Sequence, residues 1–191
     1  MLIKNEFEVT EPVEKVWQFF QNIPQVATCL PGTALTDELG DDKYKGTVAV
    51  RMGPVRLLFA GTADITSRDE AAHRIVVNAA GAEAKGRGQA SMVVTATLTK
   101  TGRGTRVDVA QDLQLSGAAA QYGRGMISDV TAVLMHEFSA NLRDRIARID
   151  RGESVTQLTA TPASGFMIGI RAARMALTRV FRRFFLPYQA A

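Results

Sequence analysis

The feature that most constrains the fold is a change of hydrophobic period along the chain. From about residue 43 to 115, apolar and polar residues alternate through segments joined by short turns, as in "KYKGTVAVRM" (43–52) and "VRLLFAGTADI" (55–65). This period of two predicts strands with one buried face. From about residue 118 to 149, apolar residues recur three and four apart, which predicts one long helix. One-faced strands followed by a single helix predict an antiparallel sheet that buries its apolar face against that helix.

The first 32 residues add one strand and two small helices to this plan. "LIKNEFEV" (2–9) alternates, "TEPVEKVWQFF" (10–20) has helical spacing, and "IPQVATCL" (23–30) predicts a short helical turn before Pro31-Gly32. The predicted fold class is therefore α+β. Residues 1–150 are expected to form one domain, a curved antiparallel sheet of about seven strands wrapped round a long C-terminal helix.

A strongly bent sheet leaves space beneath the helix that covers it, and several inward positions carry small residues. These are Gly46, Gly61, Ala63, Ala90 and Ala96. Such residues cannot fill the space, so we expect an internal cavity lined mainly by apolar groups. Alternation and helix phase together predict its lining, which consists of Val48, Val50, Met52, Leu57, Phe59, Met92, Val94, Gln111, Leu113, Tyr122, Met126, Ile127, Val130, Leu134 and Phe138.

The end of the chain has a different composition. All 19 acidic residues lie at or before Glu153, whereas five of the 23 basic residues lie beyond it, so the first 153 residues carry 18 basic against 19 acidic side chains. The basic character therefore belongs to one segment, "GFMIGIRAARMALTRVFRRFFL" (165–186). A Ser/Thr/Ala-rich stretch at 151–164 predicts a flexible linker before a third segment at 165–191.

On a helical projection, the arginines of this segment fall opposite its bulky apolar residues. A cationic amphipathic helix of this kind lies in the interface of an anionic membrane. The residues predicted to bind the membrane are Phe166, Ile170, Arg171, Arg174, Leu177, Arg179, Phe181, Arg182, Arg183, Phe184 and Phe185. A groove on a partner protein and packing on the chain's own domain are the alternatives. Nucleic-acid binding is not expected, because the aromatic residues lie away from the arginines.

The sequence offers weak signals for catalysis and none for a metal site. His73 lies in a polar loop, His136 has one neighbouring carboxylate, and the single cysteine, Cys29, is expected to be a packing residue. "GRG" recurs at 86–88, 102–104 and 123–125. The first two repeats fall between strands, and the third falls where the long helix is expected to have begun, so none predicts a phosphate-binding loop. We expect no catalytic residues. No window reaches the roughly 18 uninterrupted apolar residues of a membrane span, and the N-terminus is not expected to be a signal peptide.

Four strings in this order resemble a known family. They are "CLPG" (29–32), "KGTVAVRMGPVRLLFAGTADI" (45–65), "KGRGQA" (85–90) and "SGAAAQYGRGMI" (116–127). Together they resemble the START/Bet v 1-like helix-grip superfamily, also called SRPBCC, and within it the family of the carbon monoxide dehydrogenase G subunit. The resemblance covers residues 1 to about 150. It implies a helix-grip fold with a hydrophobic cavity for a lipid-like or aromatic ligand.

The resemblance also implies a role beside carbon monoxide dehydrogenase, linking that enzyme to the membrane and its quinone pool. The leading hypothesis is a non-catalytic quinone carrier in electron transfer, with menaquinone as its bound ligand and no covalent cofactor. Its expected place is the cytoplasm, peripheral on the inner face of the cell membrane. One alternative is an adaptor that recruits the dehydrogenase without a ligand, and another is a cyclase or hydrolase of the same superfamily.

Overall fold

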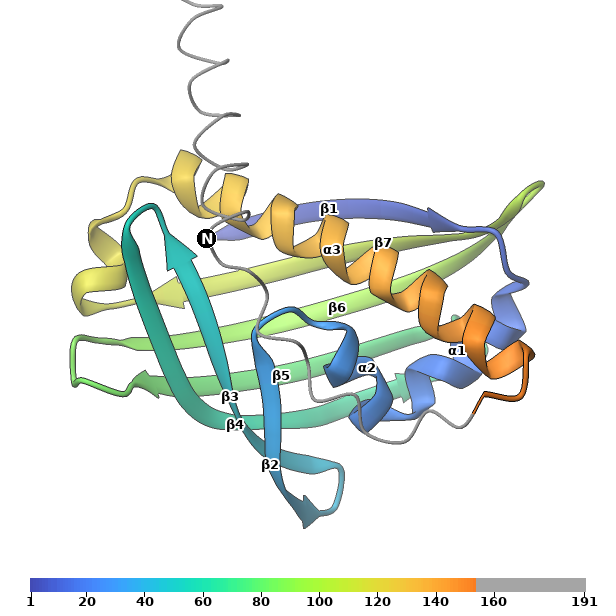
Figure 1. Cartoon of the computed structure of the whole chain (residues 1–191), viewed down its shortest axis with the longest axis horizontal. Coiled ribbons are helices and arrows are strands. Elements are labelled where there is room, and N and C mark those ends of the chain that lie inside the picture. The colour runs from blue at the N-terminus through green and yellow to red at the C-terminus, as the bar shows by residue number, and fades with distance from the viewer. Residues whose placement is uncertain (154–191) are drawn as a thin grey trace, which may run out of the picture.

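The computed structural model describes residues 1–153, which form a single antiparallel sheet crossed by one long helix. The strand order is β1-β7-β6-β5-β4-β3-β2, and α3 lies diagonally across the concave face of the sheet (Figure 1). The elements are β1 (Leu2–Val9), α1 (Val13–Gln21), α2 (Ile23–Cys29), β2 (Thr33–Gly40), β3 (Lys43–Met52), β4 (Val55–Asp69), β5 (Arg74–Glu83), β6 (Gln89–Thr101), β7 (Gly104–Leu115), the 3-10 turn η1 (Gly117–Gln121) and α3 (Arg124–Asp150). The predicted helix-grip architecture is thereby confirmed.

The two short helices close one end of the sheet. Pro12 directly precedes α1, whose helical spacing buries Val13, Val16 and Trp17. The side-chain oxygen of Asn22 accepts a hydrogen bond from the Gln25 backbone N–H at 3.1 Å, which caps the start of α2. Both helices therefore form where the local sequence predicts them, and they turn their apolar sides toward the sheet.

Hydrophobic alternation alone does not predict strand β2. It is the edge strand of the sheet, and nearly all of its residues are exposed. A strand without a buried face has no need for alternation, so its pairing depends on the turn that follows it. Asp41 and Asp42 have φ of 49° and 58°, the left-handed conformation of a tight hairpin turn, and they join β2 to β3.

The long helix begins later than the hydrophobic pattern predicts. The expected start near residue 118 is wrong, because residues 117–121 form η1 and α3 starts at Arg124. Gly117 has a φ of +67°, which interrupts a regular helix, and Gly123 is extended at the helix boundary. The third "GRG" repeat therefore does open a helix, contrary to the sequence-based expectation.

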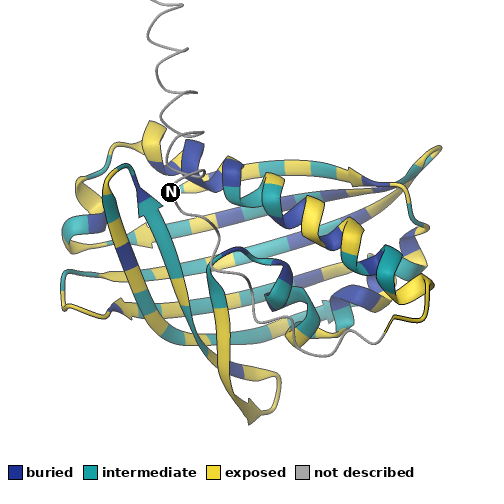
Figure 2. Ribbon diagram, viewed as in Figure 1, coloured by how far each residue is buried: buried dark blue, intermediate teal, exposed yellow. Residues whose placement is uncertain are grey.

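The buried side chains gather in two main cores at opposite ends of the sheet. We call the larger one the α1-end core; it includes Trp17, Phe20, Val107, Phe138 and Leu142. The smaller one, the η1-end core, contains the buried residues Ile3, Met52, Leu57, Ala119 and Ile127. Figure 2 shows that the buried residues on α3 alternate with exposed ones along its length, as expected for a helix with one side on a sheet.

The predicted tail lies outside the described residues. This applies to the linker beyond residue 153 and to the whole membrane-binding segment at 165–191, including all of its arginines and phenylalanines.

In the part of the chain that the structure describes, the helices lack the combination of length and apolar character that crossing a membrane requires.

Candidate functional site

The candidate site is the inner face of the sheet, which we define as the set of alternate strand residues that point toward α3. The register places Gln111 of β7 between Ile3 of β1 and Val94 of β6, and continues through Val77 of β5 to Ile65 of β4. The next row toward η1 runs from Leu113 through Met92 and Ala79 to Ala63. Residues from five strands therefore share one surface under the helix.

The α1-end core is filled by the protein's own side chains. The Phe138 ring on α3 contacts the Phe7 ring with centroids 5.7 Å apart and the Phe20 ring at 6.3 Å, both edge to face. Leu142 and Val107 are completely buried beside them. Aromatic side chains from β1, α1 and α3 therefore occupy the space between sheet and helix at this end.

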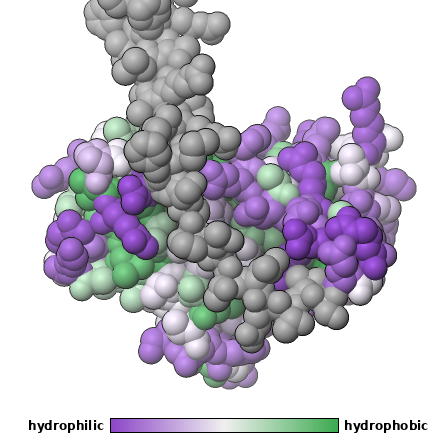
Figure 3. All heavy atoms as spheres, viewed as in Figure 1, coloured by the Kyte–Doolittle hydropathy of each residue, from purple (hydrophilic) through white to green (hydrophobic). Residues whose placement is uncertain are grey.

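The η1-end core is looser around its buried centre. Leu57 is fully inaccessible and Met52 is 6% exposed, but Val50, Phe59, Leu113 and Tyr122 around them are half-buried. Figure 3 shows hydrophobic side chains gathered on the viewed surface around β3 and β4 at this end. This end thus presents apolar surface on the side of the sheet that faces α3.

Between the two cores lies a stretch of small residues that we call the middle zone. It consists of Gly61, Ala63, Ala79, Gly81, Ala90 and Met92. All six point to the inner face, belong to neither core and remain partly exposed. Five of the six are glycine or alanine, so the side chains of these strands contribute little volume to the middle of the inner face.

Two amide side chains lie beside the middle zone. Asn5 and Gln111 are diagonal neighbours on β1 and β7, because Ile3 pairs with Gln111 and Asn5 pairs with Val109. The Asn5 Nδ2 atom is buried with no hydrogen-bond partner. Gln111 is 6% exposed, and no group within residues 1–153 hydrogen-bonds to its side chain. Leaving a buried donor without an acceptor costs about 1–3 kcal/mol, so the Asn5 amide lowers the stability of the fold in the absence of a partner.

The predicted lining residues fall into three groups by position. Met52, Leu57, Gln111, Ile127, Val130 and Phe138 are buried; Val50, Phe59, Met92, Val94, Leu113, Tyr122 and Leu134 are half-buried; and Val48 and Met126 are exposed. Val48 and Met126, at 38% and 39% exposure, are too open to line a closed cavity. Phe138 belongs to the filled α1-end core, so it closes one end of the space.

Two surface hollows lie on the other side of the sheet. Their volumes are about 240 and 400 Å³. Outward-facing polar residues dominate their walls, including Thr62, Asn78 and Ser91 in the first, and Lys4 and Thr95 in the second. The walls also include Ala79 and Met92 in the first hollow and Asn5 in the second. Neither hollow is the apolar cavity that the sequence predicts on the inner face.

A buried ion pair at the end of β5 escaped the sequence analysis. Glu83 is 4% exposed, and its carboxylate accepts hydrogen bonds from the Arg87 guanidinium, the closer at 2.8 Å, and from the Lys85 N–H at 2.9 Å. The bond from Arg87, opposed by burial, lowers the pKa of Glu83 to about 2. The signal was the "KGRGQA" string itself, because its tight turn directs two backbone N–H groups at one carboxylate.

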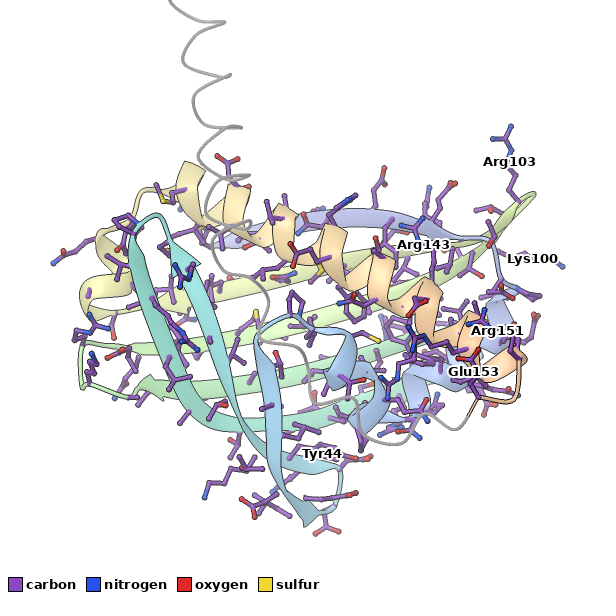
Figure 4. All side chains as sticks on the ribbon, viewed as in Figure 1. Tyr44, Lys100, Arg103, Arg143, Arg151 and Glu153 are labelled. Carbon is purple, nitrogen blue, oxygen red and sulfur yellow. The ribbon has the colours of Figure 1, made fainter. Side chains whose placement is uncertain are left out.

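Tyr44 is a second polar group on the inner face that the sequence analysis did not assign. It pairs with Ala63 across β3 and β4 and is 6% exposed (Figure 4). Burial raises the pKa of its phenol. By contrast, Lys100 near the end of β6 and Arg103 in the β6–β7 turn extend into solvent, away from the inner face (Figure 4).

The weak catalytic candidates stand apart from the inner face. His136 is exposed on α3, and the His73 ring contacts the Trp17 ring at a centroid distance of 5.5 Å. Burial raises the pKa of the Cys29 thiol to about 11, which keeps it protonated and unreactive, as expected for a packing residue. Within residues 1–153, no group of three or more His, Cys, Asp or Glu side chains could hold a metal ion.

The strings that resemble a family have a common structural role, which is close backbone approach. A Cβ on Gly88 would lie 2.1 Å from the Ser116 carbonyl oxygen, and one on Gly117 would lie 2.1 Å from that of Arg87. Thus "KGRGQA" and "SGAAAQ" pack against each other. A Cβ on Gly32 of "CLPG" would similarly meet the Ala49 carbonyl oxygen at 2.4 Å. Only glycine permits these contacts, which hold the ends of the sheet around the inner face.

Comparison with known proteins gives a family match over most of the chain. Residues 6–147 match the family model described as the G subunit of carbon monoxide dehydrogenase (CoxG). No curated protein has a significant sequence match to the chain.

Solved structures share the fold at low sequence identity. A conserved protein from Geobacillus kaustophilus is similar with a TM-score of 0.69 and 20% identity, over 78% of this chain and 96% of that one. The Zhui aromatase/cyclase from Streptomyces sp. R1128 has a TM-score of 0.57 and 14% identity, over 81% and 98% of the two chains. Ara h 8.0201 has a TM-score of 0.52 and 15% identity, over 77% and 97%. At these identities the likeness shows the fold alone.

Proposed function

The chain belongs to the CoxG family, named for the carbon monoxide dehydrogenase G subunit, and we propose that it binds a hydrophobic small molecule on the inner face of its sheet. The observation that carries this proposal is the middle zone, where small, partly exposed residues separate two packed cores. A guest placed there would contact Met92 on the sheet and would be flanked by the half-buried apolar side chains of the η1-end core. Burial of apolar surface would supply the affinity.

We further propose that the guest is a respiratory quinone with an isoprenoid tail, such as menaquinone. Such a molecule is dissolved in the bilayer, whereas a soluble oxidoreductase of the carbon monoxide dehydrogenase type acts in the aqueous phase. A protein that shields the quinone can carry it between the two, and the carrier then needs no redox centre of its own. The family match and the apolar inner face support this role.

Mass spectrometry of the bound molecule tests the binding proposal. The full chain, purified without detergent from a quinone-producing host, should yield quinone on organic extraction. Ala79→Leu, which fills the middle zone, should lose the quinone, whereas Ala80→Leu, at the neighbouring outward position, should retain it. An empty extract from the wild-type chain would favour an adaptor without a ligand. Recovery of a polyketide or ester that the chain converts would instead favour a cyclase or hydrolase.

The proposed site of action is an anionic membrane surface, to which the arginine-rich segment at 165–186 would attach the chain. Each basic residue near such a surface contributes about 1 kcal/mol, and the phenylalanines add apolar burial that salt does not screen. The proposal rests on the sequence of this segment.

Co-sedimentation with vesicles tests the attachment. The full chain should pellet with anionic vesicles, and replacing its five tail arginines by Gln should strongly weaken binding at low salt. Replacing Phe181, Phe184 and Phe185 by Ala should leave residual binding at low salt that disappears at high salt. If the arginine variant pellets as well as the wild type, the membrane role is wrong.

A further inference from the structure

The Nδ2 atom of Asn5, beside the middle zone, is buried without a hydrogen-bond partner among residues 1–153. Asn5 lies between Ile3 and Phe7 on the inner face of β1. Both neighbours are apolar: Ile3 belongs to the η1-end core, and Phe7 packs against the α1-end core. An apolar residue at the same position would pack there and leave no hydrogen-bond donor without an acceptor. The presence of asparagine instead indicates that an oxygen-bearing group meets its Nδ2 atom in a bound state.

Gln111 gives an independent reason for the same conclusion. Its side chain is almost completely buried between Ile3 and Val94, and no described residue hydrogen-bonds to its amide. It borders the middle zone, since the next inner-face row contains Met92 and Ala79. Because Asn5 and Gln111 are diagonal neighbours on adjacent strands, one molecule on the inner face can contact both side chains.

We infer that Asn5 and Gln111 form a polar anchor that binds a ring oxygen of the hydrophobic guest; this inference rests on the proposed binding function. An uncharged amide donates through its NH₂ group and accepts through its carbonyl oxygen. The pair can therefore donate to the carbonyl of a quinone and accept from the hydroxyl of the reduced quinol. The class of ligand is a conjugated dione together with its two-electron-reduced, doubly protonated diol.

This chemistry suits exchange between an enzyme and a membrane better than a charged anchor would. An arginine or lysine at the same position could donate to the dione but could not accept a hydrogen bond from the diol. Reorientation of two neutral amides accommodates both forms without burying a charge. We therefore expect the full chain to bind oxidised and reduced ligand with similar affinity, within about threefold.

Titration of the full chain with a matched pair of small probes tests the anchor. Menadione carries two ring carbonyls, whereas 2-methylnaphthalene has the same ring and methyl group without oxygen. The wild-type chain should prefer menadione by roughly threefold to tenfold, the effect of one net hydrogen bond. Asn5→Leu and Gln111→Met, each of similar shape to the native residue, should each reduce that preference while retaining affinity for the hydrocarbon.

Gln114→Met is the matched control, because Gln114 lies on the same strand and points to the outer face. It should leave the preference unchanged. The wild-type protein supplies a readout without substitution: side-chain amide signals of Asn5 and Gln111 in ¹H–¹⁵N spectra should shift with menadione and not with 2-methylnaphthalene.

The outcomes separate the anchor from the proposed function. If both variants keep the full preference for menadione, or if the amide signals do not move, the anchor is overturned while binding of hydrophobic guests stands. If the wild-type chain binds neither probe, both proposals fall. Loss of the preference with either folded variant supports the anchor, so one variant that fails to fold does not prevent the decision.

Discussion

The α1 end and the middle of the inner face are built from the same strands, yet they are filled differently. At the α1 end, aromatic rings from β1, α1 and α3 meet edge to face and leave Leu142 and Val107 without solvent contact. Two rows along the same sheet, the inward residues shrink to glycine and alanine and stay partly exposed. The difference indicates that packing at the α1 end contributes more to the stability of the fold than the small residues in the middle do.

The largest expected effect lies in the filled end. Leu142→Ala should lower the free energy of unfolding by about 2–5 kcal/mol, because it opens a cavity in a fully buried core that cannot collapse around it. Leu113→Ala, at a half-buried position of the η1-end core, should cost less than half as much. Urea denaturation followed by circular dichroism measures both values. Equal losses would show that the two ends are packed alike.

A pair of alanines on the inner face sharpens the comparison directly. Ala96 is 5% exposed within the α1-end core, whereas Ala79 lies in the middle zone. Ala96→Leu should cost about 1–3 kcal/mol through overpacking, whereas Ala79→Leu should change the free energy of unfolding by less than about 1 kcal/mol. The same denaturation experiment applies. A large loss with Ala79→Leu would mean that the middle zone has no room for a guest.

This contrast also explains what the sequence could predict. Alternation over residues 2–9 correctly predicted strand β1, and the change of period located the sheet and the long helix. Helix phase placed Ile127 and Val130 in the interior but also selected Met126, which is exposed. A rotation of 100° per residue does not decide whether a residue at the margin of the apolar face is buried. Near the start of a helix this depends on the neighbouring elements that cover it, and the hydrophobic pattern of the helix does not contain them.

Other features depend on contacts between distant segments, which a local pattern does not contain. The backbone of Ser116 leaves no room for a Cβ atom on Gly88, and the backbone of Arg87 leaves none on Gly117. These glycines are therefore explained only when the β5–β6 turn and η1 lie side by side. The Glu83–Arg87 pair was missed because an acid in an alternating strand ordinarily faces water. Of the small inward residues that the sequence singles out, Gly61, Ala63 and Ala90 lie in the middle zone, whereas Ala96 is buried in the α1-end core.

The smallest expected effect concerns Glu83, whose ion pair closes the turn at the η1 end. The pKa of its carboxyl is lowered to about 2 in the folded chain, from an ordinary value of 4.5, so its contribution to stability is present above pH 4.5. That contribution is lost as the pH falls toward 2. Glu83→Gln should therefore melt at a lower temperature than the wild type at pH 7, and the difference should shrink between pH 5 and pH 2.5.

Thermal melts of both chains at pH 7, 5, 3.5 and 2.5 measure this difference. Glu6→Gln, at an exposed outward position of β1, controls for the loss of one negative charge. Because Gln keeps the shape of Glu and one acceptor oxygen, the backbone N–H groups of Lys85 and Arg87 retain a partner, and the difference in Tm reports mainly on the charge. A difference that stays constant with pH would assign the effect to packing in the turn, and the η1 end would then resemble the filled end more closely than its half-buried side chains suggest.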